Sequence, residues 1–140
     1  MPPDPAVPAP GALSAGRRSV GAMRVTGVHH VSLNVTDLER SLAFWVELVG
    51  LRPLPRPDFS FAGSWLAAGE QQLHLIAVGR VPPDTGQHVA MAVDDLDRAV
   101  TELRAAGVTV SEPTPLPTGA RQCFCRDPDG NRLELHQPAP

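Results

Sequence analysis

The chain has 140 residues, 42% of them hydrophobic and 19% charged, which is enough apolar material for one ordered domain. Its formal net charge is −3 and its 12 basic residues are scattered, so we expect no nucleic-acid or anionic-membrane partner, because phosphate binding requires a concentrated basic face. All the basic residues are arginines and tyrosine is absent, which excludes Schiff-base chemistry on lysine and acid–base catalysis by tyrosine.

The first segment differs in composition from the rest of the chain. Residues 1–22 contain five prolines and lack the apolar run of a signal peptide, and Met23 comes directly before the patterned sequence. We therefore predict a disordered proline-rich tail over 1–22 and a single folded domain over 23–140. No stretch approaches the roughly 20 apolar residues of a membrane span, so the sequence favours a cytoplasmic protein.

The first half of the domain begins with a strand. Apolar and polar residues alternate over 28–35, which predicts one buried side. Thr36 and Glu39 then form a T-x-x-E capping box, so we expect a helix that runs to about residue 49 and stops at Gly50. The segments that follow are predicted as an edge strand or loop over 51–56 and strands over 63–69 and 71–78.

The second half repeats this order. A strand over 87–93 precedes a helix that begins at Asp94, continues through Ala106 and ends at Gly107. The remaining segments are predicted as strands over 108–113, 120–126 and 132–137, with a tight turn at 127–131.

The two halves also share residues. "HHVSLNVTDLERSLAFWVELVGL" and "HVAMAVDDLDRAVTELRAAGV" agree at the pairs His30/His88, Asp37/Asp95 and Arg40/Arg98, among others. Each half consists of a strand, a helix and three further strands. The sequence therefore predicts an α+β fold, in which two tandem βαβββ modules, about 24–80 and 86–138, form a curved mixed sheet.

Four polar side chains occupy matching positions in the two modules. His30 and His88 lie in the first strands, and His74 and Glu134 lie in "LHL" and "LEL" of the last strands. Each is followed by an apolar residue, and His74 and Glu134 lie between two leucines, so all four should point away from the helix-packed side. If the modules pair around a pseudo-twofold axis, three imidazoles and one carboxylate converge on one cavity. Such a donor set suits Zn²⁺, Ni²⁺, Fe²⁺ or Mn²⁺, whereas the alternative is a hydrated sheet face that carries ordinary histidines.

These segments and "FCRDPDGNRLELH" resemble the vicinal oxygen chelate superfamily over about residues 25–137. That group includes glyoxalase I, extradiol dioxygenases, fosfomycin-resistance thiol transferases, methylmalonyl-CoA epimerase and bleomycin-binding proteins. The resemblance implies that His30, His74, His88 and Glu134 bind one divalent metal ion per site. It also implies that the metal chelates neighbouring oxygens of a small-molecule substrate and stabilises an enolate or oxyanion, with Glu134 and His74 as catalytic residues.

The resemblance leaves several activities open. We prefer a metal-dependent, glyoxalase-like lyase or isomerase, with a thiol such as glutathione as a candidate cosubstrate, although the two-carboxylate arrangement of some glyoxalases is absent. An extradiol-type dioxygenase fits if His74 is not a ligand. A metal-free, antibiotic-sequestering protein of the bleomycin-resistance type is the non-enzymatic alternative. The lack of lysine and tyrosine argues against the phosphonate and potassium sites of the fosfomycin enzymes. Because two chains complete each site in many small members, the resemblance implies a homodimer with shared sites.

Other residues are candidates for the wall of the cavity. Ser32 and Asn34 share the face of His30, and Trp65 lies, with Phe59 and Phe61, where the family has its substrate wall. Arg121 could meet an anionic substrate group.

The remaining polar and aromatic positions have simpler interpretations. His136 is the substitute ligand if one of the four fails, and His29 should point to the face opposite His30. Trp45 belongs to the buried stripe of the first helix, and the two cysteines are expected to be buried, free thiols, Cys123 and Cys125.

Overall fold

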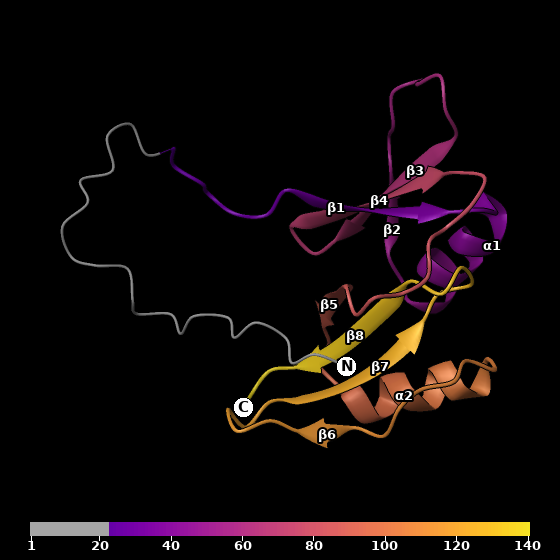
Figure 1. Ribbon diagram of the computed structural model, residues 1–140. Coiled ribbons are helices and arrows are strands. Elements are labelled where there is room, and N and C mark those ends of the chain that lie inside the picture. Colours follow the sequence, from indigo (N-terminus) through magenta and orange to yellow (C-terminus); the bar gives the residue numbers. More distant parts are fainter. Residues whose placement is uncertain (1–22) are drawn as a thin grey trace, which may run out of the picture.

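The computed structural model describes residues 23–140, so the tail predicted over 1–22 lies outside the described residues. Two four-stranded mixed sheets form the frame (Figure 1). The first sheet contains β1 (His30–Val35), β2 (Arg52–Leu54), β3 (Gly63–Ala68) and β4 (Gln71–Ala77). The second sheet contains β5 (His88–Ala92), β6 (Thr114–Pro115), β7 (Arg121–Arg126) and β8 (Arg132–Gln137).

The two sheets have the same topology. The strand order is β1-β4-β3-β2 in the first and β5-β8-β7-β6 in the second, and in each sheet the first strand pairs in parallel with the last long strand. The other pairings are antiparallel. This arrangement confirms the predicted α+β fold with two tandem modules, and it gives equivalent positions to His30 and His88 and to His74 and Glu134.

One helix follows the first strand of each module. The first helical segment consists of α1 (Leu38–Leu42) and a π-helix, η1 (Ala43–Leu48), and the second is α2 (Leu96–Ala105). The chain leaves both segments through glycines with positive φ, as predicted: Gly50 has φ 88° and Gly107 has φ 84°.

The predicted helix starts were wrong by one residue in each module. The N-caps are Asp37 and Asp95, whose carboxylates accept hydrogen bonds from the backbone N–H groups three residues later, at 3.1 and 3.0 Å. Thr36 does not cap the helix, because its hydroxyl donates to Asp129 in the other module.

The strand predicted over 108–113 is also absent. Here Ser111 makes one backbone bond to the carbonyl of Phe124, at 3.0 Å, and its hydroxyl accepts from the Phe124 N–H at 2.8 Å. A side chain thus takes the place of a backbone acceptor, and regular pairing begins only at β6.

Both helical segments pack against one side of their sheets, and one hydrophobic core runs through both modules. Trp45 is fully buried in it and Cys123 and Cys125 are buried and free, which confirms the three predictions. No helix in residues 23–140 is long and apolar enough to cross a membrane.

The turn between β7 and β8 joins the modules. The buried carboxylate of Asp127 accepts from the indole N–H of Trp45 at 3.3 Å, and it organises its own turn through the backbone N–H groups of Asp129 and Asn131. The side-chain amide of Asn131 donates to the carbonyl of Asn34 at 3.0 Å. Figure 1 shows this turn beside α1, so the end of the chain fastens the first module to the second.

Candidate functional site

Each sheet has one face that carries a helix and one open face. In the first module, the register places His30, Ser32 and Asn34 on the open face. The strand pairing puts His74 beside Ser32 on one side and beside Trp65 on the other. The predicted cavity residues of this module therefore share a single surface.

His74 lies in the middle of a stack of rings. Its imidazole is 4.0 Å from that of His30, with 14° between the planes, and 4.6 Å from the indole of Trp65, with 9° between the planes. Its Nε2–H donates to the side-chain oxygen of Gln72 at 2.8 Å. Burial, followed by the charges of His30, His29 and Arg56, lowers the pKa of His74 below the usual 6.5, which favours the neutral ring at pH 7.

The open face of the second module combines a histidine with a carboxylate. His88 and Glu134 share it with Phe124, whose ring meets that of His88 edge-on at 5.6 Å. The Nδ1–H of His88 donates to the carbonyl of Gly86 at 2.9 Å, so Nε2 keeps its lone pair for a ligand. Glu134 is only 9% exposed, yet within residues 23–140 its carboxylate makes no hydrogen bond or ion pair.

These two pairs of residues lie on different modules of the same chain. Over the part of the chain that the structure describes, no three His, Cys, Asp or Glu side chains lie close enough together to hold a metal ion. The convergence of His30, His74, His88 and Glu134 thus stays a prediction for an assembly in which the two open faces meet.

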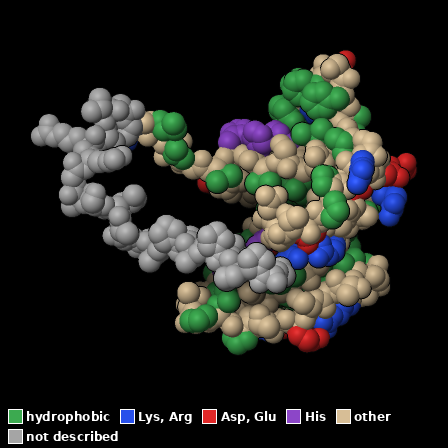
Figure 2. Space-filling model, in the orientation of Figure 1, with side chains coloured by type: hydrophobic (Ala, Val, Ile, Leu, Met, Phe, Trp, Pro, Cys, Tyr) green, Lys and Arg blue, Asp and Glu red, His purple; other side chains and the backbone are tan. Residues whose placement is uncertain are grey.

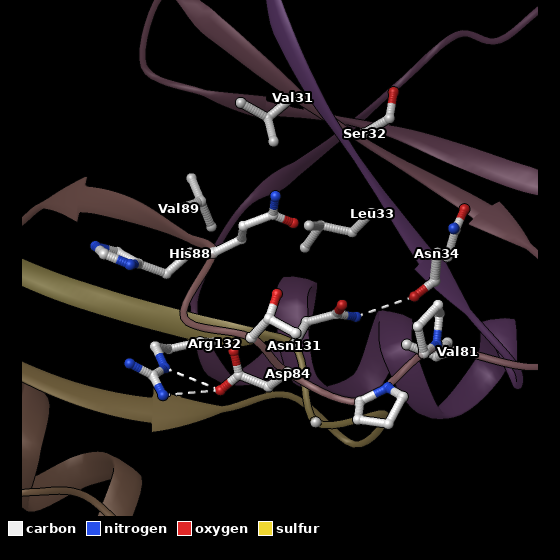
Figure 3. A pocket seen from close by; sticks show the side chains of 15 residues that line it. Val31, Ser32, Leu33, Asn34, Val81, Asp84, His88, Val89, Asn131 and Arg132 are labelled. Atoms are coloured by element: carbon white, nitrogen blue, oxygen red, sulfur yellow. Dashed lines mark hydrogen bonds and ion pairs between the residues drawn. The ribbon is translucent and has the colours of Figure 1, made fainter. Parts of the chain in front are cut away.

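A cavity of about 360 Å³ lies between the edge of β1 and the start of β5 (Figure 3). His88 and Asn34 line it together with the segment before β5 and the start of β8. Its wall includes an ion pair that the sequence had not indicated, in which Asp84 accepts from Arg132 at 2.9 to 3.0 Å.

Asp84 also accepts from the Gly86 N–H and from Arg126. The backbone hydrogen bond from Gly86, followed by the two guanidinium groups, lowers the pKa of Asp84 to about 2. Since Arg132 is the strand neighbour of His88, this carboxylate balances a positive charge beside that histidine. The "PDTG" turn was the available signal, because Asp two residues before Gly is typical of such a turn.

Two residues lie elsewhere than predicted. Arg121 is on the helix-packed side, where its guanidinium makes two hydrogen bonds to Asp97 of α2, at 2.8 and 3.0 Å, so it does not line the open face. His29 does not point away from His30, because it precedes β1 and the alternation of the strand does not yet apply. Its Nδ1 is 2.9 Å from Nδ1 of His30.

Figure 2 shows the purple histidines gathered at the start of β1 and green hydrophobic side chains on the loop between β2 and β3. That loop carries Phe59 and Phe61, which are 40% and 46% exposed. Phe59 lies 6.0 Å from the ring of Trp65, so the loop extends the stack of the first open face. The role of Trp65 and its two neighbours as a substrate wall stays a prediction.

Comparison with known proteins assigns the whole region to one group. The sequence model of the Glyoxalase/Bleomycin resistance protein/Dioxygenase superfamily matches residues 27–135. The glutathione transferase FosA of Serratia marcescens is 34% identical over 116 residues, which cover 78% of this chain and 79% of that protein. A probable chloroplastic lactoylglutathione lyase of Arabidopsis thaliana is 31% identical over 124 residues; the matched region covers 79% of this chain but only 35% of that longer protein.

Among solved structures, TnmS3, an antibiotic binding protein from Streptomyces sp. CB03234, superposes with a TM-score of 0.72 and 30% identity. The match covers 84% of this chain and all of that one. Enzymes and a binding protein are thus similar to the same two modules.

Proposed function

Because the chain belongs to the Glyoxalase/Bleomycin resistance protein/Dioxygenase superfamily, we propose that it is a divalent-metal-dependent enzyme acting on a small molecule with two neighbouring oxygens. The observation that carries the proposal is the state of the second open face. The carboxylate of Glu134 has no hydrogen-bond donor or cation among residues 23–140, and its oxygens reach the surface of the open face, where the Nε2 of His88 is also available. A carboxylate and an imidazole nitrogen that share an open face without partners in the described chain are suitable ligands for a divalent metal ion.

Ring geometry favours three ligands over four. An imidazole nitrogen donates its lone pair in the plane of the ring, and the nearly parallel, stacked rings of His30 and His74 lie in separate planes, so one metal ion does not lie in both planes. His30, His88 and Glu134 therefore form the proposed ligand set. Two histidines and one carboxylate leave open positions for substrate oxygens and suit Fe²⁺ or Mn²⁺, with Zn²⁺ and Ni²⁺ as alternatives.

The site would be completed by two chains. His30 belongs to one open face and His88 with Glu134 to the other, so the proposed site has the first module of one protomer facing the second module of its partner. This is the homodimer with shared sites that the sequence suggested.

The residues of the proposed site would then have different roles in the reaction. When bound, the metal supplies Lewis-acid stabilisation of negative charge on the substrate oxygens. His74, neutral at pH 7 and held by Gln72, accepts or returns a proton. Ser32 and Asn34, on the same face, orient the polar part of the substrate. Glyoxalase-like isomerisation and thiol transfer are the first reactions to assay, with glutathione as the thiol, since the similar proteins carry those names. Extradiol cleavage of a catechol is assayed beside them, because that reaction fits a ligand set without His74.

The test is metal binding by the full chain. Elemental analysis and calorimetry with Mn²⁺, Fe²⁺, Ni²⁺ and Zn²⁺ should find one ion per chain in the wild type and a loss of at least about tenfold in affinity in His30→Ala, His88→Ala and Glu134→Gln. His74→Ala should keep the ion and lose turnover. His136→Ala removes the candidate substitute ligand on the second face and should also keep the ion, because the three-ligand set does not include it. Loss of the ion in His74→Ala would restore the four-ligand set.

A mixing experiment tests the sharing of sites. Refolding His30→Ala chains together with Glu134→Gln chains should restore about a quarter of the wild-type metal, because each mixed dimer contains one site with both residues intact. If each chain holds its own site, mixing restores nothing.

The second candidate is a metal-free binding protein, which the similarity to the antibiotic binding protein favours. It predicts that Glu134→Gln leaves ligand affinity unchanged. No metal uptake by the wild type with any of the four ions would reject the enzyme and leave this candidate.

A further inference from the structure

The loop before β3 and its neighbours form an aromatic wall, defined here as Phe59, Phe61 and Trp65 with the guanidinium of Arg56 over it. We propose that this wall selects a ligand that has a flat aromatic ring and an anionic group beside it. The inference rests on the proposed function only for the reaction, because recognition of the ring and of the charge needs no metal.

The distribution of aromatic residues supports a binding role. The chain has only four Phe and two Trp residues. Phe44 and Trp45 are buried in the core, whereas the other four lie on or beside the open faces. Exposing large aromatic side chains to water loses the free energy that burial would supply, so most of this small set contributes little to the core.

The rings form two parallel sets, and the ring of Phe59 is tilted by 49° from the indole of Trp65. Phe59 and Phe61 are nearly parallel, with 10° between their planes and 5.4 Å between centroids. Trp65 lies parallel to His74, which in turn is stacked on His30. A planar ring laid on the wall continues an existing stack and remains close to His30 and His74, where the chemistry is proposed.

Arg56 supplies the charge. Its guanidinium carbon lies 4.7 Å above the ring of Phe59 and 5.1 Å from that of Phe61, and one N–H group donates to the carbonyl of Phe61 at 2.9 Å. It is half-buried, and it makes no ion pair within residues 23–140. Because this positive charge has no carboxylate of the described chain beside it, it is complementary to an anionic ligand group.

The sequence makes room for this arginine. Gly63 lies two residues before Trp65 on the same face of β3, where a Cβ would clash with the backbone carbonyl of Leu75 and come within 3.1 Å of the Arg56 guanidinium. The Leu75 carbonyl therefore requires glycine at this position, and the missing side chain also leaves space for Arg56 beside the rings.

The test uses three matched probes and metal-free full-length protein. The probes are 2-naphthoate, its saturated counterpart decahydronaphthalene-2-carboxylate, which has the charge without the flat ring, and 2-naphthamide, which has the ring without the charge. Calorimetry should show 2-naphthoate binding at least about fivefold more tightly than either control.

Variants locate the binding. Trp65→Leu should weaken 2-naphthoate about tenfold, and Arg56→Gln should weaken it about fivefold while leaving 2-naphthamide unchanged. Arg52→Gln is the control for charge. Arg52 is exposed and lies on the same face of the sheet as Trp65, because it pairs with Ala67, two residues after Trp65 on β3. Retained circular dichroism and thermal unfolding of each variant confirm that the fold is intact.

The possible results separate the two proposals. Equal affinity for the three probes, or Trp65→Leu that changes the oligomeric state but not the affinity, would overturn the wall as a ligand site. Preferential binding of 2-naphthoate in a protein that takes up no metal would keep the wall and reject the metal enzyme.

Discussion

The two modules share their backbone plan but differ on their open faces. At the position where the first module has His74 beside Trp65, the second has Glu134 beside Phe124. The first face continues into a stack of rings and an unpaired arginine, whereas the second combines a histidine and a buried carboxylate with the ion pair of Asp84 and Arg132. Repetition thus preserved the frame, while the two surfaces took on different chemistry, one suited to holding a ring and the other a cation.

Substitution in the β7–β8 turn, which joins the two modules, should have the largest effect on stability. Asp127→Ala removes a buried carboxylate that accepts hydrogen bonds from the Trp45 indole and from two backbone N–H groups of its turn, so we expect a loss of about 3 kcal/mol in the free energy of unfolding. Urea denaturation measures it. Asp94→Ala is the control, because Asp94 is exposed, and an equal loss in both variants would contradict the role of the turn.

The frames of the two modules should respond alike. Asp37→Ala and Asp95→Ala each remove one N-cap of the same geometry, and each should cost about 1 kcal/mol of unfolding free energy. The same denaturation experiment measures both. A large effect at one cap and none at the other would show that the modules are not energetically equivalent.

The faces should differ in their response to acid. The pKa of His74 is lowered in the folded protein, so the unfolded chain binds more protons below the usual pKa of 6.5, and stability falls as the pH drops through that value. For Asp84, with a pKa lowered from 3.8 to about 2, the stabilising contribution is complete above 3.8 and is lost between 3.8 and 2.

Thermal unfolding of metal-free protein from pH 8 to pH 2 separates the two windows. His74→Phe should flatten the curve only near pH 6, and Asp84→Asn only below pH 4. If His74→Phe leaves the upper window unchanged, another group controls it.

The smallest effect concerns the helix-packed side of the second module. Burial raises the pKa of Cys123, and burial together with nearby negative charge raises that of Cys125 to about 11. Neither thiol should react with iodoacetamide at pH 8 in the native protein, and both should react in urea. Mass spectrometry counts the adducts, and rapid native labelling would mean that this side opens.

The order of helices and strands could be predicted because the same sequence pattern occurs in both halves of the domain. Both helix starts were nevertheless placed one residue early, at Thr36 and Asp94, although the aspartates shared by the two halves, Asp37 and Asp95, are the true caps. The T-x-x-E motif pointed to Thr36 as the N-cap, whereas aligning the two halves would have identified the shared aspartates. The same comparison would have revealed Phe124 as the counterpart of Trp65.

The site was only partly predictable, for a physical reason. Alternation along a strand assigns residues to a face, and it correctly grouped His30 with His74 but wrongly placed His29 on the opposite face. It contains no information about ring orientation, so the parallel stack could not be foreseen. Arg121 and Arg56 show the same limit, because a long side chain finds its partner through tertiary contacts such as Asp97 or the Phe59 ring.

The hydrogen bonds between the first module and the β7–β8 turn also bear on folding during biosynthesis. Their partners are separated by 82 to 97 positions in sequence. During translation the first module therefore emerges before the groups that secure it. The indole N–H of Trp45 can bind Asp127 only after the β7–β8 turn has also been synthesised.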